Sequence, residues 1–129
     1  MIKVLLADDQ TLIRQGIRLL LEIETDIQVV GQAANGREAL EQVESLRPDV
    51  VLMDVRMPEM DGVAATREIG KLFPDVKVII LTTFEDDETV FEGLKAGARG
   101  YLLKDISSEE MAAAVRRVAA HSPLEPRWS

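Results

Sequence analysis

The sequence has no cysteine, which excludes disulfide frameworks, zinc sites built on thiolates and thiol nucleophiles. It also has no apolar run close to the ~20 residues that a membrane-spanning helix needs. Met1 leads directly into an apolar segment, which leaves no room for a signal peptide. Together these absences predict a cytoplasmic protein that makes no contact with a membrane.

Positive charge is scarce as well, since 15 Lys and Arg residues stand against 23 Asp and Glu residues, for a net charge of -8. A surface of this sign repels phosphate backbones, so we expect no nucleic-acid binding through a basic face of this chain. At 129 residues the chain can bury one core without disulfides or metal ions. We expect one domain over residues 1–120. The proline-rich segment 121–129 is interpreted as the start of a linker or a cloning tail.

Five short apolar segments alternate with five segments of helical periodicity. The predicted strands span residues 2–7, 27–30, 50–53, 76–81 and 100–103, and the predicted helices span residues 11–24, 35–47, 62–73, 86–97 and 107–120. This alternation predicts an α/β fold, a doubly wound five-stranded parallel sheet with right-handed crossovers. Of the two common strand orders, the flavodoxin-like order 2-1-3-4-5 fits a chain of five strands.

The first and fourth predicted helices carry apolar residues whose placement bears on partners. One stripe of the first helix has the spacing of a face laid on a sheet, namely Ile13, Ile17, Leu20 and Leu21. A second stripe lies beside it, formed by Leu12, Leu19 and Ile23. The first helix is therefore either deeply packed, with a broad apolar face, or also in contact with a partner subunit. In the fourth helix the predicted inner face is Val90, Phe91 and Leu94.

Polar side chains follow the ends of four predicted strands. They are Asp8, Asp9, Asp54, Thr82 and Lys104. Ligands of open α/β sheets bind beyond the carboxyl ends of the strands, so all of these side chains can open onto one crevice. Asp54 has the central place, because it ends the most continuous apolar strand. An aspartate in this position is also often only a turn former or a helix cap.

Three clustered carboxylates require a cation, because like charges ~4 Å apart repel by ~4 kcal/mol at an effective dielectric constant of ~20. With oxygen ligands and no nearby histidine or cysteine, the predicted ion is Mg²⁺, or Mn²⁺ in its place. Asp8 and Asp9 would anchor the metal, while Asp54 would attack a phosphoryl group and become an acyl phosphate. Lys104 would hold one phosphoryl oxygen, and Thr82 would donate a hydrogen bond to another.

Four segments, LLADD, LMDVRMPEMDG, LTT and GYLLKD, follow one another along the chain. In these segments and their spacing the chain resembles the CheY-like receiver domain of bacterial two-component response regulators, over residues 1 to about 120. The resemblance implies that Asp54 is the phosphoacceptor and that the backbone carbonyl of Arg56 joins Asp8, Asp9 and Asp54 as a metal ligand. It further implies that Thr82 and Tyr101 form the switch, and that Lys104 is the lysine typical of the family.

The segments ADDQTLIRQGIRLLLE, LTTF and GYLLKD are most similar to those of the NarL/LuxR (FixJ-type) branch of response regulators. This branch implies a sensor histidine kinase as phosphoryl donor and a homodimer through the first and fifth helices after phosphorylation. The dimer hypothesis also draws on alanines of the last helix, among them Ala112, Ala113 and Ala119, which would let another helix approach closely. DNA would be bound only through a C-terminal helix-turn-helix domain outside this sequence. The response would appear on the face of the fourth helix, fifth strand and fifth helix.

Four further positions carry separate expectations. Asp105 stands where many receivers have proline, often with a cis bond, which leaves the geometry of the loop from Lys104 to Ser107 open. Arg56 and Phe84 each lie two residues beyond a site residue, and Phe84 is expected to hinder the access of water to the phosphoryl bond. The single histidine, His121, is interpreted as a solvated side chain.

Three alternatives compete with a receiver that controls a DNA-binding domain. The first is a stand-alone receiver. The second is an aspartyl-phosphate phosphohydrolase of the haloacid dehalogenase type, but such enzymes place an acid where this chain has Arg56. The third is a flavodoxin-like nucleotide carrier, but the first strand is followed by Asp8 and Asp9 instead of a glycine-rich phosphate loop. We therefore expect a signalling protein and not an enzyme.

Overall fold

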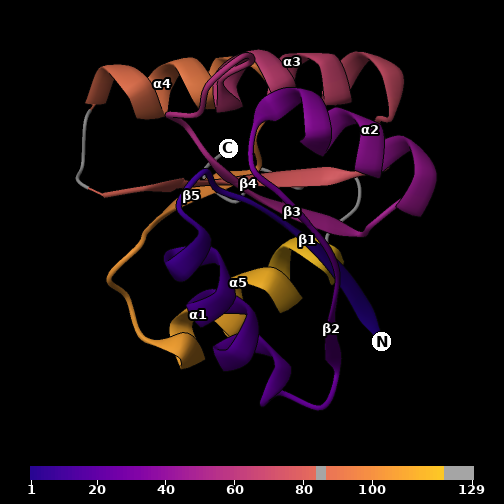
Figure 1. Ribbon diagram of the computed structural model, residues 1–129, viewed down its shortest axis with the longest axis vertical. Helices are drawn as coiled ribbons and strands as arrows, with labels where there is room; N and C mark the ends of the chain where they lie inside the picture. Colours follow the sequence, from indigo (N-terminus) through magenta and orange to yellow (C-terminus); the bar gives the residue numbers. More distant parts are fainter. Residues whose placement is uncertain (84–86, 121–129) are drawn as a thin grey trace.

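The computed structural model describes residues 1–83 and 87–120, in which a sheet lies between two layers of helices (Figure 1). The strands are β1 (Ile2–Ala7), β2 (Ile27–Ala33), β3 (Val50–Asp54), β4 (Lys77–Thr82) and β5 (Gly100–Leu103). The helices are α1 (Thr11–Glu22), α2 (Gly36–Leu46), α3 (Gly62–Leu72), α4 (Asp87–Lys95) and α5 (Ser108–Ala120). All strand pairs are parallel and the order is β2-β1-β3-β4-β5, so the predicted fold and strand order are confirmed.

Strand β3 is buried on both sides, which explains why its sequence shows no polar alternation. Val51 and Met53 belong to the core under α2 and α3, whereas Val50 and Leu52 belong to the core under α1 and α5. All four side chains are 0% exposed. Figure 1 shows the same arrangement, with α2, α3 and α4 over one face of the sheet and α1 and α5 over the other. None of the helices within the described ranges is long and apolar enough to cross a bilayer.

Side-chain caps begin three of the helices. The backbone N–H of Glu38 donates to Asn35 at 2.8 Å, and that of Glu110 donates to Ser107 at 3.1 Å, as the sequence predicts for both helices. Asp61 caps α3 in the same way, by accepting from the N–H of Ala64 at 2.8 Å. These caps fix the ends of the loops that lead into the helices.

The predicted inner faces of α1 and α4 were partly wrong. Leu20 is 47% exposed, because only Ile17 and Leu21 of α1 are buried against the sheet and α5. The second α1 stripe is exposed too, at 84% for Leu12, 65% for Leu19 and 70% for Ile23, so the deeply packed interpretation of α1 is wrong.

In α4 the helix packs through its glycine, not through its large apolar residues. A Cβ atom on Gly93 would lie 2.9 Å from the side chain of Ile80, so the helix and the sheet approach closely there. Phe91 and Leu94 consequently turn outward and are 59% and 42% exposed. Val90 is the one residue of the predicted inner face that is partly buried.

The segment after β3 folds back tightly onto the strand end. The N–H of Gly62 donates to the carbonyl of Val55 at 2.8 Å, and the backbone of Gly62 lies so close to Asp54 that a Cβ atom would collide with the Asp54 carbonyl. The N–H of Gly36 similarly donates to the carbonyl of Met60 at 2.8 Å. Glycine is required at position 62 because the chain must pass against the residue that ends β3.

We predict that Gly62→Ala lowers the free energy of unfolding by about 2–3 kcal/mol or more, because the methyl group would push against backbone that cannot yield like a side chain. Gly16→Ala in α1 is the control. A Cβ atom there meets nothing within 4 Å, so the substitution should stabilise the protein by roughly 0.5–1 kcal/mol through helix propensity. Urea unfolding measures both, and equal effects of the two substitutions would contradict the tight passage at Gly62.

Candidate functional site

The strand order brings the predicted site residues to one edge of the sheet. Asp8 and Asp9 follow β1, Asp54 is the last residue of β3, Thr82 the last of β4, and Lys104 follows β5. Because β1, β3, β4 and β5 are consecutive neighbours in the sheet, their carboxyl ends are adjacent. A crevice of about 220 Å³ opens there, and its lining includes Asp9, Asp54, Arg56, Thr82 and Lys104.

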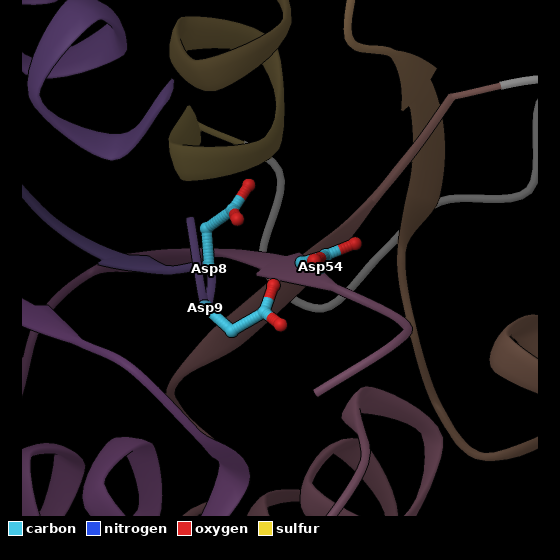
Figure 2. Close-up of side chains that lie close together, drawn as sticks. All are labelled: Asp8, Asp9 and Asp54. Atoms are coloured by element: carbon cyan, nitrogen blue, oxygen red, sulfur yellow. The ribbon is translucent and has the colours of Figure 1, made fainter. Parts of the chain in front are cut away.

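Three carboxylates gather at this edge. One oxygen each of Asp8, Asp9 and Asp54 lies within 4.8 Å of the others, with Asp8 and Asp54 buried and Asp9 exposed. Figure 2 shows Asp8 and Asp9 next to each other past the end of one strand, with Asp54 beside them at the end of the next. The predicted convergence of these residues is therefore present in the structure.

Lys104 carries the positive charge among these acids. Its ammonium lies 2.8 Å from Oδ2 of Asp8 and 3.3 Å from Oδ1 of Asp54, and the lysine side chain is only 11% exposed. Burial alone would lower the pKa of Lys104, but the contacts with Asp8 and Asp54 outweigh it, so the pKa is raised. Lys104 therefore remains an ammonium at neutral pH.

The ionised form of Asp54 is disfavoured despite the nearby Lys104. Burial raises the pKa of Asp54 above its ordinary value, and the charges of Asp8 and Asp9 act in the same direction, while Lys104 opposes them. One ammonium faces three carboxylates, so the cluster keeps an excess of negative charge when its groups are ionised. An added cation would relieve this repulsion.

Asp8 also has coordinating capacity left. Its Oδ1 accepts a hydrogen bond from the N–H of Gln10 at 2.9 Å. Its buried Oδ2 is ion-paired with the Lys104 ammonium at 2.8 Å, and each carboxylate oxygen keeps a second lone pair for a further ligand. Buried carboxylate oxygens with open coordination, and no nitrogen or sulfur donor in the cluster, suit a hard cation such as Mg²⁺. The residues present thus fit the predicted metal.

The remaining predicted residues lie in different surroundings. Thr82 is 8% exposed and borders the crevice, whereas Tyr101 is 38% exposed on β5 and does not line it. Arg56 is exposed at the rim. The loop at Asp105 is well fixed without proline, since the N–H of Lys104 donates to the Thr82 carbonyl at 2.8 Å and the chain turns through a further bond from Ile106 to Leu103. Phe84 and His121 lie outside the described residues.

Sequence reasoning missed three polar residues that also line the crevice, namely Gln10, Thr83 and Thr89. Gln10 and Thr83 follow directly on predicted strand-end residues, so a wider search of these strand ends would have included them. Thr89 belongs to α4 and reaches the crevice through the position of that helix. No periodicity in the sequence indicates such a placement.

Comparisons with known proteins agree with this architecture. The family model for the response regulator receiver domain matches residues 4–116. The chain is 46% identical over 126 residues to the transcriptional regulatory protein LnrK of Bacillus subtilis, covering 98% of this chain and 57% of that protein. It is 44% identical over 126 residues to the response regulator protein VraR of Staphylococcus aureus, covering 97% of this chain and 60% of that protein. The chain thus spans less than two thirds of the length of these relatives.

Solved structures include close neighbours of this fold. The signal receiver domain of NarL from Mycobacterium tuberculosis has a TM-score of 0.89 and 34% identity, with 92% of this chain and 96% of that chain covered. A DNA-binding response regulator of the LuxR family from Staphylococcus aureus has a TM-score of 0.87 and 30% identity, with 92% and 99% covered. Phosphorylation and Mg²⁺ binding at an acidic pocket are general in this family. The chain belongs to the receiver domains of two-component response regulators, and its structural neighbours include members of the NarL/LuxR group.

Proposed function

We propose that Asp54 accepts a phosphoryl group from the phosphohistidine of a sensor histidine kinase, in a reaction that depends on Mg²⁺. The observation that carries this proposal is the convergence of Asp54 with two further carboxylates and the Lys104 ammonium at one crevice. The receiver domain would occupy residues 1–120, with the segment 121–129 leading into a linker.

In the proposed reaction an oxygen of Asp54 attacks the phosphorus atom, and the bond from phosphorus to the donor imidazole nitrogen breaks. The imidazole leaves with the electron pair of that bond and takes up a proton. Lys104, now 3.3 Å from Asp54, would turn to a phosphoryl oxygen and offset the charge that arrives there. Thr82 would donate its hydroxyl to a second phosphoryl oxygen.

Asp8, Asp9, Asp54 and the backbone carbonyl of Arg56 would hold the Mg²⁺ ion. When bound, the ion neutralises negative charge on the carboxylates and on the incoming phosphoryl group. Asp8 is the best fixed of the three acids, because its two oxygens contact Gln10 and Lys104. Asp9 is exposed, so its side chain can adjust to the ion.

The output would be a change of partner. As Thr82 moves toward the phosphoryl group, Tyr101 would turn inward from its present 38% exposure and alter the face of α4, β5 and α5. The relatives are transcriptional regulators longer than this chain, which supports control of a C-terminal DNA-binding domain. The protein would act in the cytoplasm, where a kinase has ATP, as a stoichiometric acceptor and not as an enzyme that turns over a substrate.

Incubation with acetyl phosphate and Mg²⁺ should add one phosphoryl group to the protein, as seen by intact mass. Asp54→Asn should carry no adduct, because the amide cannot act as the nucleophile. Asp49→Asn is the matched control, since Asp49 lies just before the start of β3, at the opposite end of the strand, and should leave phosphorylation intact. An adduct that persists in Asp54→Asn, or that forms equally well after removal of Mg²⁺ by a chelator, would refute the assignment.

We also propose that the phosphorylated protein forms a homodimer through α1 and α5. Leu12, Leu19 and Ile23 leave an apolar stripe exposed on α1. Ala112 is 0% exposed and packs in the core cluster that contains Ile17 of the same chain, so the alanines of α5 partly serve this internal contact. Ala113 of α5 is exposed, whereas Ala119 is partly buried against the same core cluster.

An ion-pair cluster links α5 to the segment that follows α1. The Arg116 guanidinium of α5 donates to Asp26 at 2.8 and 2.9 Å and to Glu24 at 2.5 Å, and both acids lie just beyond α1. Arg116 in turn lowers the pKa of Asp26. These contacts fix the end of α1 against α5, so the two helices can present one surface to a second copy.

With a stable phosphoryl mimic such as beryllofluoride bound, Leu19→Glu should weaken self-association at least tenfold, because a carboxylate would be buried in an apolar contact. Leu72→Glu on α3 changes a residue of similar exposure, 58% against 65%, on the other face of the sheet and serves as the control. Sedimentation velocity measures the dissociation constants. If both variants associate as the wild type does, the proposed dimer surface is incorrect.

A further inference from the structure

The backbone carbonyl of Asp8 is bound by a side chain and not by a neighbouring strand. The N–H of Asp8 continues the ladder to β2 by donating to the Ala33 carbonyl at 3.0 Å. Strand β2 ends at Ala33, where the chain turns toward α2. The Asp8 carbonyl is taken instead by Nη1 of Arg14, at 2.5 Å, so a side chain of α1 replaces the next strand partner.

Arg14 is itself held in place by a second contact. Its Nε donates to Oε1 of Gln32 on β2 at 3.0 Å. The backbone carbonyl of Gln32 accepts a hydrogen bond from Nε2 of Gln42 on α2 at 2.6 Å. The planar guanidinium therefore spans two acceptors in fixed geometry, which a lysine ammonium could not do equally well.

We propose that Arg14 is a positioning residue for the metal-binding loop, and that Gln32 sets its orientation. This inference rests on the proposed function of Asp8 and Asp9 as metal ligands. A peptide group is planar, so fixing the Asp8 carbonyl also fixes the direction of the Asp9 N–H and the position of the Asp9 Cα atom, from which the side chain starts out. Asp9 is exposed, so its backbone is the part of the residue that this peptide plane holds in place before an ion binds.

Three contacts together hold Asp8 in place. Arg14 binds its carbonyl, the N–H of Gln10 binds Oδ1, and Lys104 lies beside Oδ2. Of these, only the Arg14 contact comes from the body of α1. Loss of it would leave a partly buried carbonyl without its partner, free to turn and to carry the peptide of Asp9 with it.

The direction in which Mg²⁺ affinity changes when Arg14 is removed distinguishes a positioning role from a purely electrostatic one. If Arg14 acted only as a nearby positive charge, its removal would reduce repulsion and tighten Mg²⁺ binding. If it positions the loop, its removal weakens binding, typically by about tenfold for a residue that orients a metal ligand. Gln32 carries no charge, so a change at this position tests orientation alone.

The test compares Arg14→Met, Arg14→Lys and Gln32→Met with the control Arg18→Met. Arg18 lies one turn further along α1, pairs with Glu22 at 3.3 Å and is 45% exposed in its side chain. Calorimetric titration should show Mg²⁺ binding about tenfold weaker in Arg14→Met and less weakened in Gln32→Met. Arg14→Lys should fall between Arg14→Met and the wild type, and Arg18→Met should match the wild type. Unchanged or tighter binding in Arg14→Met would overturn the proposal.

A second measurement needs no metal. Hydrogen exchange of the Gln10 amide, which donates to Asp8, should be several-fold faster in metal-free Arg14→Met than in Arg18→Met. Urea unfolding of each variant checks that the rest of the fold is retained. Equal exchange in these two variants would overturn the role of Arg14. Failure of the wild type to bind Mg²⁺ would instead contradict the proposed function. The hydrogen-exchange comparison would then test on its own whether Arg14 fixes the Asp8 loop.

Discussion

One ammonium group among three carboxylates is the interaction on which the site depends. Lys104 lies within 3.3 Å of both Asp8 and Asp54, and all three side chains are almost withdrawn from water. The ion pairs keep these charges in the fold, but a single positive charge cannot balance the cluster. The remaining negative charge favours binding of a cation, and under the proposed function that cation would allow Asp54 to bond to the phosphorus atom.

The packing of the sheet and helices holds these charges at one place. Strands β1 and β3 are covered on both faces, so their ends cannot shift without exposing the core. The close passage of Gly62 past Asp54 and the contact of Arg14 with Asp8 hold the segments that follow. Stability built from apolar packing thus offsets the cost of gathering like charges at the sheet edge.

Much of this arrangement follows from the sequence because it depends on simple rules. Apolar runs that end in polar residues predict the strands, and strand order then brings Asp54 and Lys104 together. Side-chain caps are equally local, so Asn35 and Ser107 could be recognised from their neighbours in sequence.

What the sequence did not reveal depends on distances between elements. Phe91 has helical spacing with Val90 and Leu94, yet it is exposed because Gly93 lets α4 approach the sheet on a different face. Thr89 reaches the crevice for the same reason, through helix placement and not through any motif. The contact of Arg14 with Asp8 arises where β2 happens to end, and periodicity carries no information about such an end effect.

The central claim is that the cluster has too much negative charge for Lys104 to balance. Calorimetric titration of Mg²⁺ into the metal-free wild type and Lys104→Met tests it most directly, since methionine keeps an unbranched apolar stem of similar length but removes the charge. The account predicts one Mg²⁺ ion bound by the wild type and tighter binding, by several-fold, in the variant. Absence of binding in the wild type, or weaker binding in a folded Lys104→Met, would contradict it.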